Sequence, residues 1–165
     1  MTKLRTERLV LRPFERQDAV ALFEIFSDPA VMRYWSSLPH TCVQQTEALI
    51  EETIEADPAT TSEFIVERNG VVIGKAGFWK VPEVGFLFHP SVWGQGIAAE
   101  ALRAVIAFGF DVRRLDRITA DVDPDNSASL RLLAKLGFVE TGRAQNTFKI
   151  GKTWVHSVYL SLDAT

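Results

Sequence analysis

The stretch that decides the fold is Trp93-Gly94-Gln95-Gly96-Ile97-Ala98-Ala99. It follows a short apolar run at residues 84–88 and leads into a helical pattern that extends from about residue 94 to residue 112. Two apolar stripes at four-residue steps mark this helix: Ala98, Leu102, Ile106 and Phe110, and Ile97, Ala101 and Val105. A strand, a glycine-rich turn and a long helix in this order predict an α/β protein.

The glycines predict a phosphate site at the start of the helix. Glycine lets the backbone approach a ligand closely, and the N–H groups at a helix start favour negative charge. A turn selected only for tight packing of strand against helix would have the same residues, so the pattern alone is a weak signal.

Two nucleotide sites also have glycine loops. The pattern Gly-x-Gly-x-x-Ala fits a dinucleotide site, and Asp116 lies about 20 residues beyond Gly96, where the ribose-binding acid is expected. However, residues 89–93 separate the strand from the first glycine, Asp116 precedes its strand, and little chain remains after Asp123 for a second nucleotide-binding half. A nucleoside-triphosphate loop is excluded because no Gly-Lys-Ser or Gly-Lys-Thr triplet follows the glycines.

The rest of the chain predicts further strands and helices around this unit. On the N-terminal side we expect a strand at 8–12, helices at 18–26 and 43–55, an irregular segment at 31–41, and a hairpin of 64–68 with 71–79 around Asn69-Gly70. On the C-terminal side we expect a strand at 117–122, a helix at 126–136 closed by Gly137, and strands at 138–140 and 154–162. The order β-α-α-β-β-β-α-β-α-β-β predicts a mixed α/β sheet in a single domain over residues 1–165.

Composition excludes several classes of protein. The chain has 165 residues, a formal net charge of -3 and scattered basic residues, which does not fit a nucleic-acid binder. No apolar run approaches the roughly 18 residues of a membrane span, so we expect no membrane partner. Cys42 is the single cysteine, and His40, His89 and His156 are far apart in sequence, so we expect neither an internal disulfide nor a metal site. These features fit a cytoplasmic protein.

Three separated segments resemble one known family. They are the glycine loop with small residues at Gly96 and Ala98, the run Asn126-Ser127-Ala128-Ser129 before a helix that ends in Lys135-Leu136-Gly137-Phe138, and the opening Thr6 to Phe14. Together they resemble the GNAT acetyltransferases, and most closely the ribosomal-protein N-terminal acetyltransferases of the RimJ/RimL type. Trp93 replaces the family's usual Gln or Arg, as is common in that branch. The resemblance runs from about Thr6 to Leu162 and implies a GNAT-like sheet with splayed central strands and a β-bulge, for which Gly85 is a compatible place.

The resemblance implies acetyl-CoA as co-substrate and no metal. The backbone of Phe86, Leu87 and Phe88 would pair with the pantetheine arm, and Asn126 and Ser129 would lie near the pantetheine or the phosphates. The loop that would hold the pyrophosphate consists of Trp93, Gly94, Gln95, Gly96, Ile97, Ala98 and Ala99.

The implied reaction is direct attack of an amine on the thioester. Glu83 at the start of the motif strand is the candidate base, although a solvated glutamate at a strand end would have the same position, and Glu100 is the second candidate. A backbone N–H near Phe88 could stabilise the oxyanion. The family's usual tyrosine acid is replaced by Leu133, which leaves Ser129 as the candidate acid unless it only bonds the helix backbone.

The acceptor side is predicted from aromatic residues. Met32, Tyr34, Trp35 and Trp79 could line the acceptor pocket, although aromatic residues at these spacings also fit a core, and the segment 31–41 is the candidate lid. The expected function is N-acetylation of a primary amine, either a protein N-terminus or a small molecule. The alternatives are a non-catalytic acyl-CoA-binding sensor and a nucleotide-dependent oxidoreductase. Dimers occur in this branch, so the resemblance also allows a homodimer.

Overall fold

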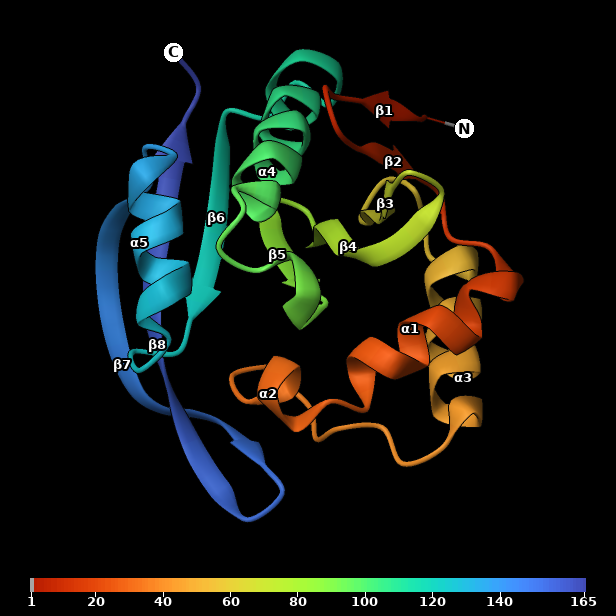
Figure 1. The fold of residues 1–165 in the computed structure, drawn as a ribbon. Helices are drawn as coiled ribbons and strands as arrows, with labels where there is room; N and C mark the ends of the chain where they lie inside the picture. Colours follow the sequence, from red (N-terminus) through yellow and green to blue (C-terminus); the bar gives the residue numbers. More distant parts are fainter. Residues whose placement is uncertain (1) are drawn as a thin grey trace.

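A computed structural model describes residues 2–165, which form one mixed sheet with helices on both of its faces (Figure 1). The sheet has eight strands within these residues, in the order β1-β2-β3-β4-β5-β6-β8-β7. The strands are β1 (Leu4–Arg5), β2 (Val10–Arg12), β3 (Ser62–Arg68), β4 (Val71–Lys80), β5 (Glu83–Phe88), β6 (Arg117–Val122), β7 (Val139–Ile150) and β8 (Thr153–Asp163). The helices are α1 (Ala19–Phe26), α2 (Pro29–Met32), α3 (Val43–Glu55), α4 (Ile97–Ala107) and α5 (Ser127–Lys135).

The central strands separate between β5 and β6. β1 to β5 pair antiparallel, and the β3–β4 hairpin turns at Asn69 and Gly70, whose φ angles are 53° and 76°. β5 and β6 run parallel and pair only at Glu83 and Thr119. The predicted α/β class, the hairpin and the splayed central strands are therefore confirmed.

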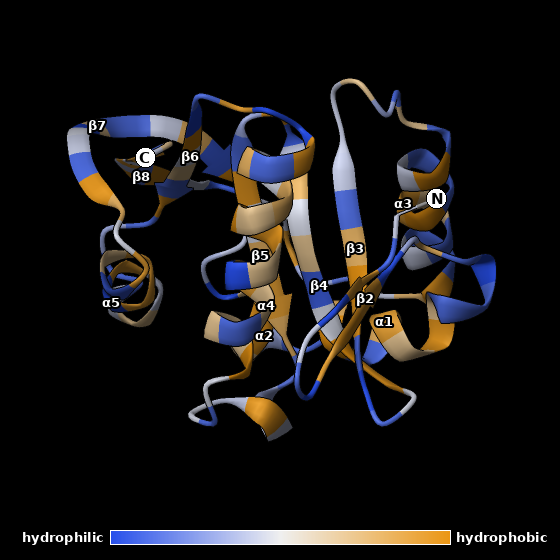
Figure 2. Ribbon diagram, turned by 90° about the horizontal axis from the view of Figure 1, so that it is seen from above, coloured by the Kyte–Doolittle hydropathy of each residue, from blue (hydrophilic) through white to orange (hydrophobic). Residues whose placement is uncertain are grey.

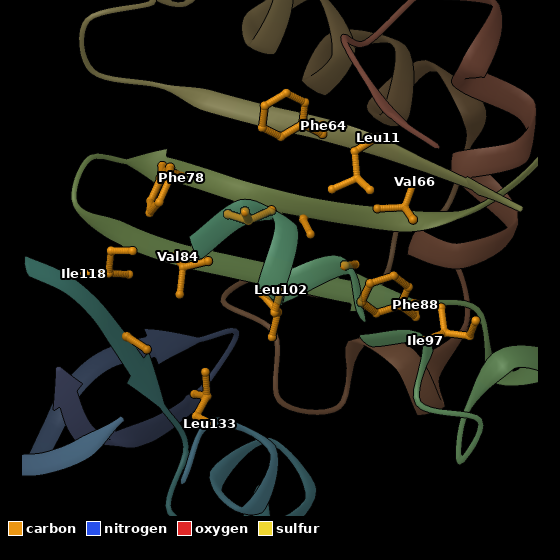
Figure 3. Close-up of a cluster of buried hydrophobic side chains, with 14 of the residues drawn as sticks. Leu11, Phe64, Val66, Phe78, Val84, Phe88, Ile97, Leu102, Ile118 and Leu133 are labelled. Atoms are coloured by element: carbon orange, nitrogen blue, oxygen red, sulfur yellow. The ribbon is translucent and has the colours of Figure 1, made fainter. Parts of the chain in front are cut away.

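The core lies on both faces of the sheet, as expected for strands whose side chains alternate. On one face the sheet packs against α4 and α5, through side chains such as Phe78, Leu102 and Leu133 (Figure 3). On the other face α1 and α3 pack against Ile65 and Leu87. Figure 2 shows the apolar stripes of α1 and α4 turned toward the sheet between them.

Several boundaries differ from the sequence expectation. The structure adds the short strand β1 and places the helix α2 at the start of the segment expected to be irregular, with the Asp28 side chain accepting a hydrogen bond from the N–H of Ala30. α4 begins at Ile97 rather than residue 94, because Gly96 at its N-cap adopts a left-handed conformation with φ 74°. The regular helix ends at Ala107 and a π-helical turn at Phe108–Val112 follows.

The last hairpin is longer than predicted. β7 was expected at residues 138–140 but extends to Ile150 and pairs with β8 along most of its length, with register shifts between Glu140 and Gly142 and between Ala144 and Phe148. The bulge expected at Gly85 is also placed elsewhere. Gly85 pairs regularly with Gly77, and the register shift in this strand pair falls between Phe78 and Lys80.

A buried ion network joins the N-terminal strand to the sheet. The Arg12 guanidinium donates to both carboxylate oxygens of Asp18, at 2.9 and 2.7 Å, and to Glu67 at 2.7 Å.

We expect Asp18→Asn to lower the free energy of unfolding by about 3 kcal/mol, because it leaves the buried Arg12 charge less fully paired. Urea denaturation at pH 7 measures this loss. Asp163→Asn, which breaks the exposed pair with Arg117, is the control and should cause no measurable change. Equal losses in both variants would contradict the expectation.

Every helix within residues 2–165 is too short or too polar to pass through a lipid bilayer.

Candidate active site

Two cavities meet beside the splayed end of β5. The first, the loop cavity, has a volume of about 600 Å³ and is lined by α2, β5, the 92–96 segment, the start of α4, and α5 with its N-cap. The second, the strand-end cavity, has a volume of about 840 Å³ and is lined by α3 and by β3, β4, β5, β6 and β7. Both are lined by Tyr34 and Trp35, which follow α2. The two cavities therefore share one wall.

The glycine loop leaves an open space at the N-terminus of α4. Gly94 and Gly96 have φ angles of 71° and 74°, a conformation that side chains rarely adopt. A Cβ built on Gly94 would meet no atom within 4 Å, and one on Gly96 would meet only Arg8 Nη2, at 3.5 Å. The space next to both glycines is thus free for a ligand, and the helix N-terminus behind it favours an anion. These residues fit the pyrophosphate of a coenzyme A.

The side chains of Trp93 and Gln95 hold the loop in place through hydrogen bonds. The Trp93 indole Nε1 donates to the carbonyl of Phe88 at 2.9 Å, which fixes the loop to the end of β5. The Gln95 side chain donates to the carbonyl of Ser91 and accepts from Arg68, at 2.9 Å each. Gln95 does not line the loop cavity, unlike the other predicted cofactor residues. Those that line it are Phe86, Leu87, Phe88, Trp93, Gly94, Gly96, Ile97, Ala98, Ala99, Asn126 and Ser129.

The edge of β5 in the loop cavity is open for backbone pairing. β5 and β6 pair only at Glu83, so from Gly85 onward the β6-facing edge of β5 lacks a neighbouring strand. An extended ligand can add to such an edge through backbone hydrogen bonds. The predicted position of a pantetheine arm along residues 86–88 fits this edge.

α5 contributes its N-cap to the same cavity. The Asn126 side chain oxygen accepts a hydrogen bond from the N–H of Ser129 at 3.2 Å, which leaves the amide NH₂ of Asn126 as a donor. Leu133, which the resemblance aligned with the family's tyrosine, is fully buried in the core.

Glu83 lies at the floor of the strand-end cavity. Its Oε1 accepts a hydrogen bond from Trp79 Nε1 at 2.9 Å. Burial raises the pKa of Glu83 above its ordinary value, and the negative charge of Asp121 adds to the rise, against the Trp79 hydrogen bond and the charge of Lys80. Burial also raises the pKa of Asp121, although a hydrogen bond from Ser157 opposes the rise. A carboxylate with raised proton affinity in a cavity is suited to accept a proton.

Glu100, the second candidate base, lines neither cavity. Its carboxylate accepts hydrogen bonds from the N–H of Arg8 at 2.8 Å and from Arg8 Nε at 2.6 Å, and from the Thr6 hydroxyl at 2.5 Å. Burial acts to raise the pKa of Glu100, but these hydrogen bonds outweigh it and lower the pKa. Glu100 therefore joins the N-terminal segment to α4.

Aromatic residues form the walls above β5. A Cβ on Gly85 would lie 3.5 Å from Trp79 Cδ1 and 3.6 Å from Trp35 Cη2, so the two indoles flank this glycine. Tyr34, Trp35 and Trp79 all line the strand-end cavity, as predicted for acceptor residues. Met32 does not: it is 3% exposed and packs in the core with α1 and α3. Its place inside α2 turns it inward.

The strand-end cavity also contains charged residues that the sequence analysis missed. Besides the predicted Glu83, its charged lining residues are Glu52, Glu63, Lys75, Asp121, Asp123 and Lys149. Asp121 had a signal in sequence, because strand alternation places it on the face opposite the buried Ala120 and Val122. Lys75 also had a sequence signal, because it is a lone charge within the apolar run of β4. Glu52 lies on α3, far from β5 in the chain, and no pattern in the sequence indicated that it would reach this cavity.

The comparison with known families decides the assignment. A family model described as "Acetyltransferase (GNAT) domain" matches residues 8–139. The chain belongs to the GNAT acetyltransferase family. As a GNAT protein it is an acetyl-CoA-dependent acyltransferase, with acetyl-CoA as its co-substrate.

Relatives and solved structures agree with this family. The Bacillus licheniformis protein named "Uncharacterized N-acetyltransferase p20" is 36% identical over 151 residues, covering 86% of this chain and 85% of the relative. The spermidine N(1)-acetyltransferase of Escherichia coli strain K12 is 26% identical over 161 residues, covering 92% and 84%. A GNAT-family acetyltransferase crystal structure from Bacillus anthracis superposes with a TM-score of 0.85 at 26% identity, covering 98% of each chain. The predicted GNAT fold is thereby confirmed.

Proposed function

We propose that residues 1–165 act as one domain that transfers the acetyl group of acetyl-CoA to the primary amine of a small, positively charged acceptor. The observation that carries this proposal is the junction of the two cavities. The loop cavity offers the features of a coenzyme A site, and the strand-end cavity beside it is lined by aromatic rings and carboxylates. A donor and an acceptor that occupy these cavities would meet next to Tyr34 and Trp35.

The donor is held by backbone groups in this proposal. The N–H groups of residues 94–99 bind the pyrophosphate, and the open edge of β5 at residues 86–88 pairs with the pantetheine arm. The Asn126 amide donates to the cofactor. The phosphate-binding part needs positive φ at Gly94 and Gly96, which both glycines have.

The chemistry then needs one proton transfer before the thioester is attacked. An alkylammonium with a pKa near 10 is mostly protonated at neutral pH, so Glu83 takes its proton, directly or through water. The amine nitrogen attacks the thioester carbonyl, and a backbone N–H near Phe88 stabilises the oxyanion. The attacking nitrogen then loses its second proton, the carbon–sulfur bond breaks and CoA leaves. That proton reaches the sulfur through Ser129 or water, so the products are the amide and the CoA thiol, and a thiol pKa near 8.5 makes this departure feasible.

The charge of the strand-end cavity supports a cationic acceptor. Five carboxylates line it against two lysines, and Lys75 is already paired with Glu63. The faces of Trp35 and Trp79 are further favourable surfaces for an alkylammonium. The relative that acetylates spermidine supports a small polycation as acceptor. A peptide N-terminus is the second candidate, supported by the likeness of the segment Asn126 to Phe138 to the RimJ/RimL branch.

A matched pair of amines tests this proposal. We expect 1,4-diaminobutane to give a kcat/KM about tenfold above that of 1-aminobutane, because the second ammonium meets the uncompensated carboxylates. Release of CoA thiol from acetyl-CoA measures both. Faster acetylation of a short neutral peptide than of either amine would favour the N-terminal acetyltransferase instead. Tight CoA binding without thiol release from any amine or peptide would identify a non-catalytic acyl-CoA-binding sensor and refute catalysis.

A further inference from the structure

A buried ion pair forms part of the floor of the strand-end cavity. Glu63 on β3 and Lys75 on the neighbouring β4 bind each other through carboxylate and ammonium. Their side chains are only 8% and 5% exposed. Gly77 is the residue directly opposite Glu63 in the strand register, so no side chain from that position lies between Glu63 and Lys75.

Stability is a poor explanation for this pair. Taking both charges out of water is costly, and apolar residues of similar volume often replace such a pair without loss of stability. The pair also lines the strand-end cavity, where a ligand can reach it. A role in the site accounts for both observations.

Lys75 contacts the wall that the two cavities share. Its Nζ lies 5.2 Å from the centroid of the Trp35 ring, within the range of a cation–π interaction. Phe26 packs edge-on against the same indole, with centroids 6.5 Å apart. Trp35 lies outside the helices and strands, so these two contacts, together with Gly85 below it, define where its ring lies.

We propose that the Glu63–Lys75 ion pair positions Trp35 as the wall between the donor and acceptor cavities, and thereby sets the affinity for the amine. Glu63 binds the Lys75 ammonium, the ammonium contacts the Trp35 indole, and the indole forms one wall of the strand-end cavity. The pair also neutralises Glu63, which leaves Glu52, Glu83, Asp121 and Asp123 as the carboxylates available to the substrate amine. Lys75 and Glu63 are positioning residues in this inference, which rests on the proposed function for its kinetic part.

The kinetic test removes both charges together. The double variant Glu63→Leu/Lys75→Met keeps the volume of both side chains, and we expect it to bind CoA within about twofold of the wild type, because the glycine loop and the edge of β5 that hold the donor are unchanged. Its KM for the amine should rise about tenfold, while the KM for acetyl-CoA stays the same. Lys75→Arg, which keeps the cation beside Trp35, should retain the wild-type amine KM.

A mutant cycle shows whether the effect passes through Trp35. We expect Trp35→Leu to raise the amine KM by a similar factor, and removal of the ion pair from this variant to bring no further rise, because residues that act through one contact are not additive. If loss of the ion pair and loss of Trp35 instead multiplied each other's effect on the amine KM, the proposal would be overturned. If the double variant fails to fold, Glu63→Gln/Lys75→Gln, whose two amides can hydrogen-bond each other, removes both charges in its place. Equal amine KM values for Trp35→Leu with and without these two changes support the dependence, and unequal values overturn it.

A fluorescence readout separates this inference from the proposed function. The difference in acrylamide quenching between the wild type and Trp35→Phe isolates Trp35 from the other three tryptophans. We expect quenching of Trp35 to increase about twofold when the ion pair is removed, as the ring loses a contact. Unchanged quenching overturns the positioning role, whatever the activity. If the wild type acetylates no amine, the proposed function fails, while the quenching result still decides the role of the ion pair.

Discussion

Replacement of Glu83 with glutamine is expected to lower kcat at neutral pH by about 100-fold, the range of a lost general base. Glutamine has the same shape and can still accept the hydrogen bond from Trp79, so the floor of the cavity should keep its structure. What is lost is the group that takes the ammonium proton. Steady-state kinetics with saturating acetyl-CoA and 1,4-diaminobutane measure the change. Full kcat in this variant would refute the assignment of the base.

A second carboxylate of the same cavity is the control for charge. Glu52→Gln removes one negative charge from α3, and we expect a raised amine KM with kcat unchanged.

The pH dependence of kcat/KM is an independent check on Glu83. In the wild type kcat/KM should fall as the pH drops through the raised pKa of Glu83, where the base becomes protonated. Asp121→Asn removes a charge that raises this pKa, so the acid limb should move to lower pH. A shift of the acid limb to higher pH would contradict the effect of the Asp121 charge on the pKa of Glu83.

Gly96→Val is expected to weaken acetyl-CoA binding by about 10- to 100-fold, the equivalent of one or two lost hydrogen bonds to a charged group. Gly96 has φ 74° at the N-cap of α4, and a β-branched residue is strongly strained there. The loop must therefore change its backbone, and its N–H groups turn away from the phosphates. Calorimetric titration with CoA measures the loss.

Gly70→Val is the matched control for backbone strain. Gly70 has φ 76° in the β3–β4 turn, and a Cβ there would meet no atom within 4 Å. It should lose stability through the same strain while CoA affinity remains unchanged. Equal losses of affinity in the two variants would show that general destabilisation, rather than the loop, controls binding.

The donor side could be predicted because its signals are local in sequence. The strand, the two glycines and the helix stripe lie within residues 84–112, and glycine is the residue type that permits the positive φ found at Gly94 and Gly96. The start of α4 was placed three residues early, because sequence periodicity cannot show that Gly96 is the left-handed cap. β7 was predicted too short because Thr141, Gly142 and Asn146 interrupt the apolar pattern, whereas pairing with β8 continues past them.

The acceptor side could be predicted only in part. Tyr34, Trp35 and Trp79 were found from their residue type, but Met32 of the same segment packs in the core. The carboxylates come from different elements, α3, β3, β5 and β6, and only the tertiary fold brings them to one cavity. The Glu63–Lys75 pair depends on the register of β3 with β4, which the hairpin turn alone does not determine. Proton affinities depend on burial and therefore follow only from the structure.

The wall formed by Tyr34 and Trp35 gives the two ligands a route for thermodynamic coupling. Because one short segment lines both cavities, a conformation of it that acetyl-CoA favoured would also change the shape offered to the amine. Linkage requires reciprocity: the factor by which bound CoA alters the dissociation constant of the amine equals the factor by which the amine alters that of CoA. A wall with a single conformation would transmit no such coupling. The part of the cooperativity that Trp35→Leu abolishes therefore measures how differently the two ligands bind the conformations of this segment.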